Sequence, residues 1–101
     1  MRVLVFFDLP TLTTQDRREY SKFRKHLVRN GFLMLQESVY CKLTLNATVS
    51  KGVIQQIKKN KPANGIVQIL TLTEKQFAKI EMITGDFQSS TLNSDERLVI
   101  L

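Results

Sequence analysis

The first ten residues constrain the fold more than any other stretch of the chain. Residues 3–7 read VLVFF, an unbroken run of β-branched, aliphatic and aromatic side chains. Such a run, bounded by a proline, predicts a strand that is covered on both faces. Asp8 ends this strand, because Pro10 has no N–H for a ladder and restricts Leu9 before it. The chain is therefore expected to begin with a central strand that carries a carboxylate at its end.

This terminal carboxylate has two interpretations. In sheets of the α/β type, catalytic and binding residues commonly lie at such strand ends, which favours a functional role for Asp8. Alternatively, Asp8 accepts backbone N–H groups in the turn before residues 11–14, a common role of aspartate. Residue type alone favours the turn role, so the choice depends on the rest of the chain.

Size and composition indicate one soluble domain. The chain has 101 residues, of which 43% are hydrophobic and 24% charged, and these values are ordinary for a globular protein. No stretch approaches the roughly 20 apolar residues of a membrane span. Cys41 is the only cysteine, and its apolar neighbours predict a buried, inert thiol. Because Met1 leads directly into a strand, we expect no signal peptide, a cytoplasmic location and no membrane contact.

The net charge of +6 points to a polyanionic partner, and one predicted helix carries much of it. Thr13 and Asp16 resemble a capping box, and Asn30-Gly31 supplies a C-cap, so a helix is expected between them. One face of this helix is apolar, at the spacing of a core face. The other face is basic and is favoured as a polyanion-binding surface, because the fold alone does not require six repelling charges. These six residues are Arg17, Arg18, Lys22, Arg24, Lys25 and Arg29.

The middle of the chain predicts further strands and a second helix. Residues 32–45 suit either one long strand or a hairpin that turns near Glu37-Ser38. Asn46 begins the second helix and Pro62 stops it. Three lysines, at positions 58, 59 and 61, gather at the end of this helix. They suit the helix dipole as well as they suit a phosphate contact, and the sequence does not separate these roles.

Beyond this helix, residues 65–73 predict a strand and residues 74–80 a short helix. Met82 and Ile83 predict a short strand that ends at Gly85. Residues 86–96 are polar and indicate a linker, and residues 97–101, RLVIL, form a terminal strand that needs a sheet edge. The linker is long enough to reach a partner, at ~3.3 Å for each extended residue.

This order of elements predicts an α+β fold, namely a ferredoxin-like βαββαβ sandwich with both helices on one face. Residues 1–85 are its domain. The extra C-terminal strand, residues 97–101, is expected to be exchanged in a homodimer.

Several segments taken together resemble one family. They are the opening VFFDLP, the basic helix RREYSKFRKHLVRNGF, and GFLMLQESVY, which carries a Gln-x-Ser-Val-aromatic signature from Gln36 to Tyr40. With the polar linker and the apolar tail, they resemble CRISPR-associated protein 2, the small subunit of the spacer-acquisition machinery. The sequence around Asp8 and Met34 looks most like members of type II systems.

The resemblance implies ferredoxin-like protomers in a symmetric dimer, with each C-terminal strand laid on the partner's sheet. Such a dimer bridges two dimers of the integrase, CRISPR-associated protein 1, and supports the captured DNA duplex. Many members are also described as Mg²⁺-dependent nucleases of RNA or DNA, and the residue named for that activity corresponds to Asp8. In other members the hydrolytic activity is weak, absent or dispensable. Pro10 and Thr11 depart from the polar or acidic residues that often follow this aspartate, so the resemblance does not extend to a second local metal ligand.

The residues themselves support a scaffold more strongly than a nuclease. One carboxylate is a poor metal site, although two-fold symmetry can supply a second Asp8 and Mg²⁺ is commonly held by one or two carboxylates. No general base accompanies it, since His26 is expected to be a solvated residue of the basic helix. Ser38 and Tyr40 are candidates either to contact phosphate or to complete their strand.

We therefore expect a dimeric scaffold of CRISPR adaptation that binds duplex DNA. The alternative is a metal-dependent endonuclease or endoribonuclease that acts through paired Asp8 residues. An RNA-binding module is a third, weaker interpretation, because RNA-recognition sheets expose stacking aromatics. Here Phe6, Phe7 and Tyr40 lie in strands that look buried.

Overall fold

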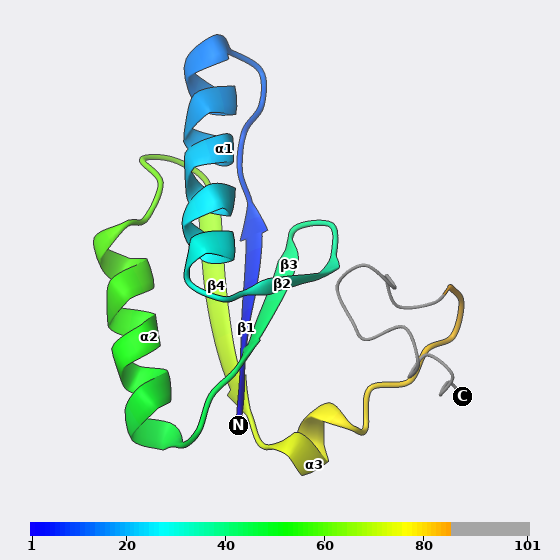
Figure 1. Ribbon diagram of the computed structural model, residues 1–101. Helices are drawn as coiled ribbons and strands as arrows, with labels where there is room; N and C mark the ends of the chain where they lie inside the picture. Colours follow the sequence, from blue (N-terminus) through cyan, green and yellow to red (C-terminus); the bar gives the residue numbers. More distant parts are fainter. Residues whose placement is uncertain (86–101) are drawn as a thin grey trace.

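The structure is a computed structural model that describes residues 1–85. The predicted linker, residues 86–96, and the predicted terminal strand, residues 97–101, lie outside the described residues. Strands and helices alternate along the chain in the predicted order (Figure 1). They are β1 (Arg2–Asp8), α1 (Thr14–Arg29), β2 (Leu33–Gln36), β3 (Val39–Leu43), α2 (Ala47–Lys59), β4 (Ile66–Leu72) and α3 (Glu74–Phe77).

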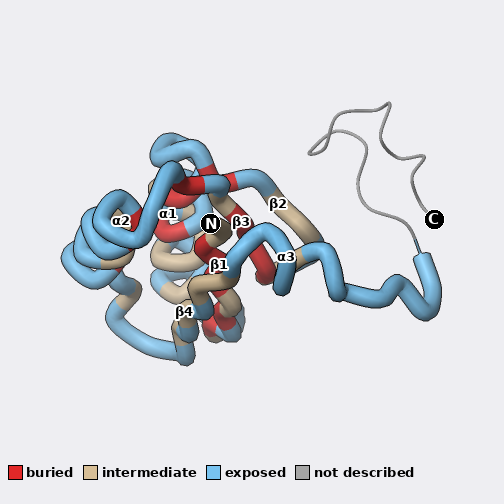
Figure 2. Tube along the Cα trace, turned by 90° about the horizontal axis from the view of Figure 1, so that it is seen from below, coloured by how far each residue is buried: buried red, intermediate tan, exposed pale blue. Residues whose placement is uncertain are grey.

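The four strands form one antiparallel sheet in the order β2-β3-β1-β4. The first strand is central, as predicted, and pairs with β3 on one side and β4 on the other. Helices α1 and α2 lie side by side on the same face of the sheet (Figures 1 and 2). This arrangement confirms the α+β, ferredoxin-like fold that the order of elements predicts.

Both long helices begin where their capping residues predict. The Thr13 hydroxyl accepts a hydrogen bond from the backbone N–H of Asp16 at 3.0 Å, and the Asp16 carboxylate accepts one from the N–H of Thr13 at 3.2 Å. In α2, the Asn46 side chain accepts a hydrogen bond from the N–H of Val49 at 2.9 Å. These contacts satisfy donors that a helix start otherwise leaves unpaired.

Residues 33–43 form a hairpin, which decides between the two predicted alternatives. Its turn is at Glu37-Ser38, and Ser38 takes a left-handed backbone conformation with φ 65°. The ladder also contains an irregularity between Met34 and Gln36. The turn lacks the Gly or Pro that usually marks a hairpin, because Ser38 takes the conformation that glycine normally supplies.

The core lies between the sheet and the two long helices. Val3, Val5 and Phe7 point from β1 toward Phe23 and Leu27 of α1, and all five side chains are buried. The Phe7 ring packs edge-on against the Phe23 ring, with centroids 5.3 Å apart. Burial of such side chains is the main stabilising contribution to the fold, at about 1.5–3 kcal/mol for each.

The prediction that β1 is covered on both faces is met on one face only. Helices α1 and α2 lie on the same side of the sheet, and the opposite side is the open sheet face (Figure 2). Alternation along the paired strands places Leu4 and Phe6 on this open face. Leu4 is nevertheless buried, and Phe6 is half-buried.

The open sheet face is apolar and partly exposed. Each strand around β1 places at least one large apolar residue on it, and each of these residues is about half exposed or more. They are Leu33 (52% exposed), Leu43 (60%), Ile66 (58%) and Leu70 (48%). Exposed apolar patches on small domains are typical of interaction surfaces.

The segment after β4 differs from the prediction in two respects. Helix α3 ends at Phe77 instead of continuing to about Ile80, and residues 78–85 contain no strand. The predicted strand at Met82 and Ile83 is therefore wrong. Ile83 is 86% exposed, because two apolar residues followed by Gly85 are too few to form a ladder without a neighbouring edge.

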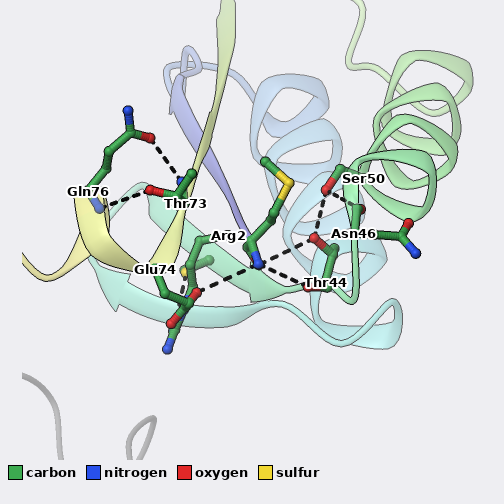
Figure 3. A network of polar contacts seen from close by, with 9 residues as sticks. Arg2, Thr44, Asn46, Ser50, Thr73, Glu74 and Gln76 are labelled. Carbon is green, nitrogen blue, oxygen red and sulfur yellow. Dashed lines mark hydrogen bonds and ion pairs between the residues drawn. The ribbon is translucent and has the colours of Figure 1, made fainter.

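Polar contacts tie the N-terminus to the segment that leads into α2 (Figure 3). The N-terminal amine donates a hydrogen bond to the Thr44 carbonyl at 3.1 Å. The Thr44 hydroxyl in turn lies 2.6 Å from the Ser50 hydroxyl, and both of these residues are buried.

None of the described helices has the length and apolar character needed to cross a membrane.

Candidate functional site

Every cation of the predicted polyanion-binding face is exposed on α1. We call these residues the basic stripe, and they are Arg17, Arg18, Lys22, Arg24, Lys25 and Arg29. Five of the six line one shallow depression of about 520 Å³ together with Thr14 and Ser21; Arg24 lies outside it. The geometry of α1 therefore places most of the predicted residues on a single surface.

The basic stripe is almost free of intramolecular partners. Arg17 donates hydrogen bonds to the carbonyls of Thr11 at 3.1 Å and Leu12 at 3.2 Å, which ties it to the loop after β1. Within residues 1–85, both ion pairs of the protein involve Glu74 and neither involves the stripe. In this part of the chain, five like charges thus face solvent without a counter-charge in contact, and an external anion can satisfy them.

Asp8 lies at the end of β1, is exposed, and shares the open sheet face with Phe6 by strand alternation. Its backbone pairs with Ile66 of β4. Among residues 1–85 no hydrogen bond or ion pair involves its carboxylate, so the turn-stabilising alternative is not realised there.

Asp8 does not form a metal site within one described chain. No three His, Cys, Asp or Glu side chains of residues 1–85 are grouped closely enough to hold a metal ion. A single exposed carboxylate does not fit Mg²⁺, which needs further oxygen ligands. Ligands for such an ion would have to come from a second copy or from a bound phosphate.

Ser38 and Tyr40 lie in different environments. The Ser38 carbonyl accepts a hydrogen bond from the Phe7 N–H at 3.1 Å, which places the hairpin turn beside the end of β1. Tyr40 is 2% exposed and stacks on Phe7 in the core, with ring centroids 5.6 Å apart. The placement of Tyr40 agrees with a strand-completing role, and the structure does not bring the two residues into one site.

His26 is not the solvated residue that its position on the basic helix predicts. It is half-buried, and its Nε2 atom is buried with no hydrogen-bond partner among the described residues. His26 differs from the prediction because α2 packs beside α1, a contact that helical periodicity does not reveal.

Cys41 is buried as predicted, and burial raises the pKa of its thiol.

The fold and the basic helix together define a small ferredoxin-like domain with a cationic surface. The sequence matches the family described as CRISPR associated protein Cas2 over residues 1–80. Proteins named "CRISPR-associated endoribonuclease Cas2" are similar over the whole chain. The one from Treponema denticola is 54% identical over 100% of both chains, and one from Streptococcus mutans is 46% identical over 100% of this chain and 93% of its own.

A solved structure is similar in fold. The crystal structure of Streptococcus pyogenes Cas2 matches with a TM-score of 0.62 and 19% identity, over 83% of this chain and 100% of that chain. This chain belongs to the CRISPR-associated protein Cas2 family. The family resemblance of the sequence is thereby confirmed.

Proposed function

We propose that this protein is a dimeric scaffold of CRISPR spacer acquisition, which binds duplex DNA and bridges dimers of the integrase CRISPR-associated protein 1. The observation that carries the proposal is the basic stripe, six exposed cations on one helix of a 101-residue chain. Like charges on one helix repel one another, and the packing of α1 depends on its other face. A phosphate backbone offsets this repulsion and is the commonest ligand of such a surface.

The dimensions of the stripe suit a DNA backbone. Arg18, Lys22, Lys25 and Arg29 follow one another along the helix axis over about 16 Å, at 1.5 Å per residue. Duplex DNA carries one negative charge per roughly 1.7 Å of its axis. Binding through this surface neutralises several phosphates without reading bases, as a scaffold for captured DNA of any sequence requires.

The open sheet face supports the dimer. Its exposed leucines and Ile66 surround Leu4 and Cys41, which are already buried. Covering these side chains with the same face of a second copy would give a closed, two-fold symmetric contact. The terminal strand at residues 97–101 would add to this contact by pairing with the partner's sheet.

The experiment measures the affinity for a short DNA duplex over a range of salt concentrations. Replacing Arg18, Lys22, Lys25 and Arg29 with Gln should weaken binding for every sequence and flatten the log–log salt slope. The slope changes by about 0.9 for each phosphate that is no longer neutralised. A control variant replaces Lys51, Lys75 and Lys79, which are exposed away from the stripe, and should leave the slope nearly unchanged. An unchanged slope in the stripe variant would refute the proposal.

A metal-dependent endonuclease is the second candidate, and the names of the relatives favour it. In this protein the reaction would depend on Asp8 residues paired across the dimer. Asp8 is exposed and lies on the open sheet face, as such pairing requires. Because a single chain offers one carboxylate there, the scaffold remains the preferred function.

Asp8→Asn separates the two candidates, since it keeps the shape of the side chain and removes its charge. A nuclease that uses Asp8 should lose Mg²⁺-dependent cleavage of RNA or DNA. A scaffold should keep duplex binding, integrase association and spacer acquisition, and DNA binding should tighten slightly because a nearby carboxylate repels phosphate. Loss of acquisition with the fold, the dimer and integrase binding intact would contradict the scaffold.

A further inference from the structure

A second cationic hollow lies between α1 and the end of α2. Its volume is about 230 Å³. Lys22 and Arg29 line it from α1, and Lys59 and Lys61 line it from the end of α2 and the residues that follow. Glu19 is the only acid in its lining. This interhelical hollow therefore collects four cations against one anion from segments that are far apart in the sequence.

The lysines of the hollow are not needed to end α2. Asn60 already caps this helix, since its backbone N–H bonds to the Ile57 carbonyl at 3.1 Å and its side-chain amide donates to the Gln56 carbonyl at 2.9 Å. Lys61 lies beyond the cap, and Pro62 restricts its backbone to extended conformations. No ion pair or hydrogen bond within residues 1–85 engages the Lys59 or Lys61 ammonium. Hydrogen-bonded capping of α2 therefore does not require Lys59 or Lys61.

The hollow is continuous with the basic stripe. Lys22 and Arg29 line both the depression of the stripe and the interhelical hollow. An anionic chain that contacts Lys22 and Arg29 on the stripe would therefore lie beside Lys59 and Lys61 as well. The cationic surface is thus wider than α1 alone and extends onto the end of α2.

His26 lies in the wall of the hollow, where α1 packs beside α2, and it also lines the neighbouring apolar cavity between the two helices. The Asn30 side-chain nitrogen donates to the His26 carbonyl at 2.8 Å and lies 3.3 Å from His26 Nδ1. That nitrogen is a donor, so a hydrogen bond between the two side chains requires Nδ1 to be the acceptor. His26 Nε2 is buried and has no hydrogen-bond partner among the described residues, so one polar atom of this ring is unpaired in the described part of the chain.

We propose that the interhelical hollow is a phosphate-binding site, which holds a phosphodiester of the nucleic acid that lies on the basic stripe. This proposal rests on the proposed function, because the stripe supplies the nucleic acid. It adds that Lys59 and Lys61 bind DNA as directly as α1 does. The footprint of the backbone then covers both helices.

The test compares three variants that each remove two charges, using one short duplex over a range of salt concentrations. Lys59→Gln/Lys61→Gln changes the hollow alone, and Arg18→Gln/Lys25→Gln changes the stripe alone. Lys51→Gln/Lys75→Gln is the matched control. We expect the hollow and stripe variants each to flatten the salt slope, by about 0.9 for each phosphate that is no longer neutralised, and the control to match the unmodified protein. Thermal unfolding checks that all three fold.

The outcomes separate the two proposals. If the stripe variant loses affinity while the hollow variant matches the control, the hollow proposal is overturned and the proposed function stands. If neither variant differs from the control, both the phosphate-site proposal and the proposed function are overturned. A parallel titration with inorganic phosphate, followed by the NMR signals of His26, Lys59 and Lys61, identifies the source of the phosphate. Phosphate-induced shifts combined with unchanged DNA affinity would mean a site for free phosphate and would overturn the nucleic-acid assignment.

Discussion

The Arg2 guanidinium lies 2.9 Å from the Glu74 carboxylate, and this contact joins the start of β1 to the start of α3 (Figure 3). The same guanidinium lies over the Phe77 ring, 4.4 Å from its centroid. The N-terminal amine is 3.9 Å from Glu74 as well. Residues separated by more than 70 positions are thereby held together at one corner of the sheet, beside α3.

Glu74→Gln should make the protein less sensitive to acid. The hydrogen bond from Arg2 lowers the pKa of Glu74, so this carboxylate contributes stability above the ordinary glutamate pKa of about 4.3 and loses it as the pH falls further. The pair is partly exposed, so its contribution is at most about 1 kcal/mol. Urea unfolding should show a difference between the variant and the unmodified protein at pH 7, and this difference should shrink as the pH is lowered through the depressed pKa of Glu74.

Glu81→Gln is the control for this measurement, because Glu81 is exposed and has no ion pair within residues 1–85. It should leave the stability at pH 7 unchanged. Equal effects of the two substitutions would mean that general charge, and not the Arg2 contact, is responsible.

Gly65→Ala should destabilise the fold by about 1–3 kcal/mol. Gly65 has φ +96°, and a Cβ atom there would lie 2.8 Å from the Asp8 carbonyl oxygen and 2.7 Å from the Leu9 side chain. Gly52→Ala is the matched control, since Gly52 lies within α2 and its Cβ would meet nothing within 4 Å. Chemical unfolding should show the control to be more stable by up to about 1 kcal/mol; a tolerated Gly65→Ala would contradict the close approach of β1 and β4.

Cys41 should react slowly with thiol reagents in the folded protein. It is 6% exposed, and burial raises the pKa of its thiol, so little of the reactive thiolate is present at neutral pH. Labelling with a chromogenic disulfide reagent should be slow in buffer and should reach one thiol per chain quickly in urea. Rapid stoichiometric labelling without denaturant would show that the open sheet face does not protect this residue.

Leu70→Glu should weaken the proposed dimer. Leu70 pairs with Leu4 across β1 and β4 and is 48% exposed on the open sheet face. A charge there would be desolvated on association. Leu12→Glu is the control, since Leu12 is 88% exposed in the loop before α1. Sedimentation at low micromolar concentration should detect dissociation for Leu70→Glu alone.

The terminal strand gives an independent test of the same dimer. A chain cut after Ser94 lacks residues 97–101 and should be a weaker dimer or a monomer, if these residues pair with the partner's sheet. A truncated protein that stays fully dimeric would refute strand exchange and would leave the open sheet face as the whole interface.

The sequence by itself determined the local elements. The capping residues Thr13 and Asn46 placed both helix starts, and the apolar run of residues 3–7 placed the central strand, because these signals act over a few neighbouring residues. The six cations of the basic stripe were also readable, since helical geometry alone puts them on exposed surface. The order of these elements predicts the ferredoxin-like fold, and the resemblance of the segments to a known family predicts the family.

Only the tertiary structure decided features that depend on elements far apart in the chain. The hairpin at Ser38 was undetermined because no Gly or Pro marked its turn. The sequence predicts a strand at Met82 and Ile83, but the described residues form none there, because an apolar pair needs a sheet edge to pair with. His26 is half-buried because α2 packs beside α1, and Lys59 and Lys61 meet the basic stripe for the same reason. The spacing of residue types within one segment does not predict which helices become neighbours. That depends on how the apolar faces of the helices pack on the sheet.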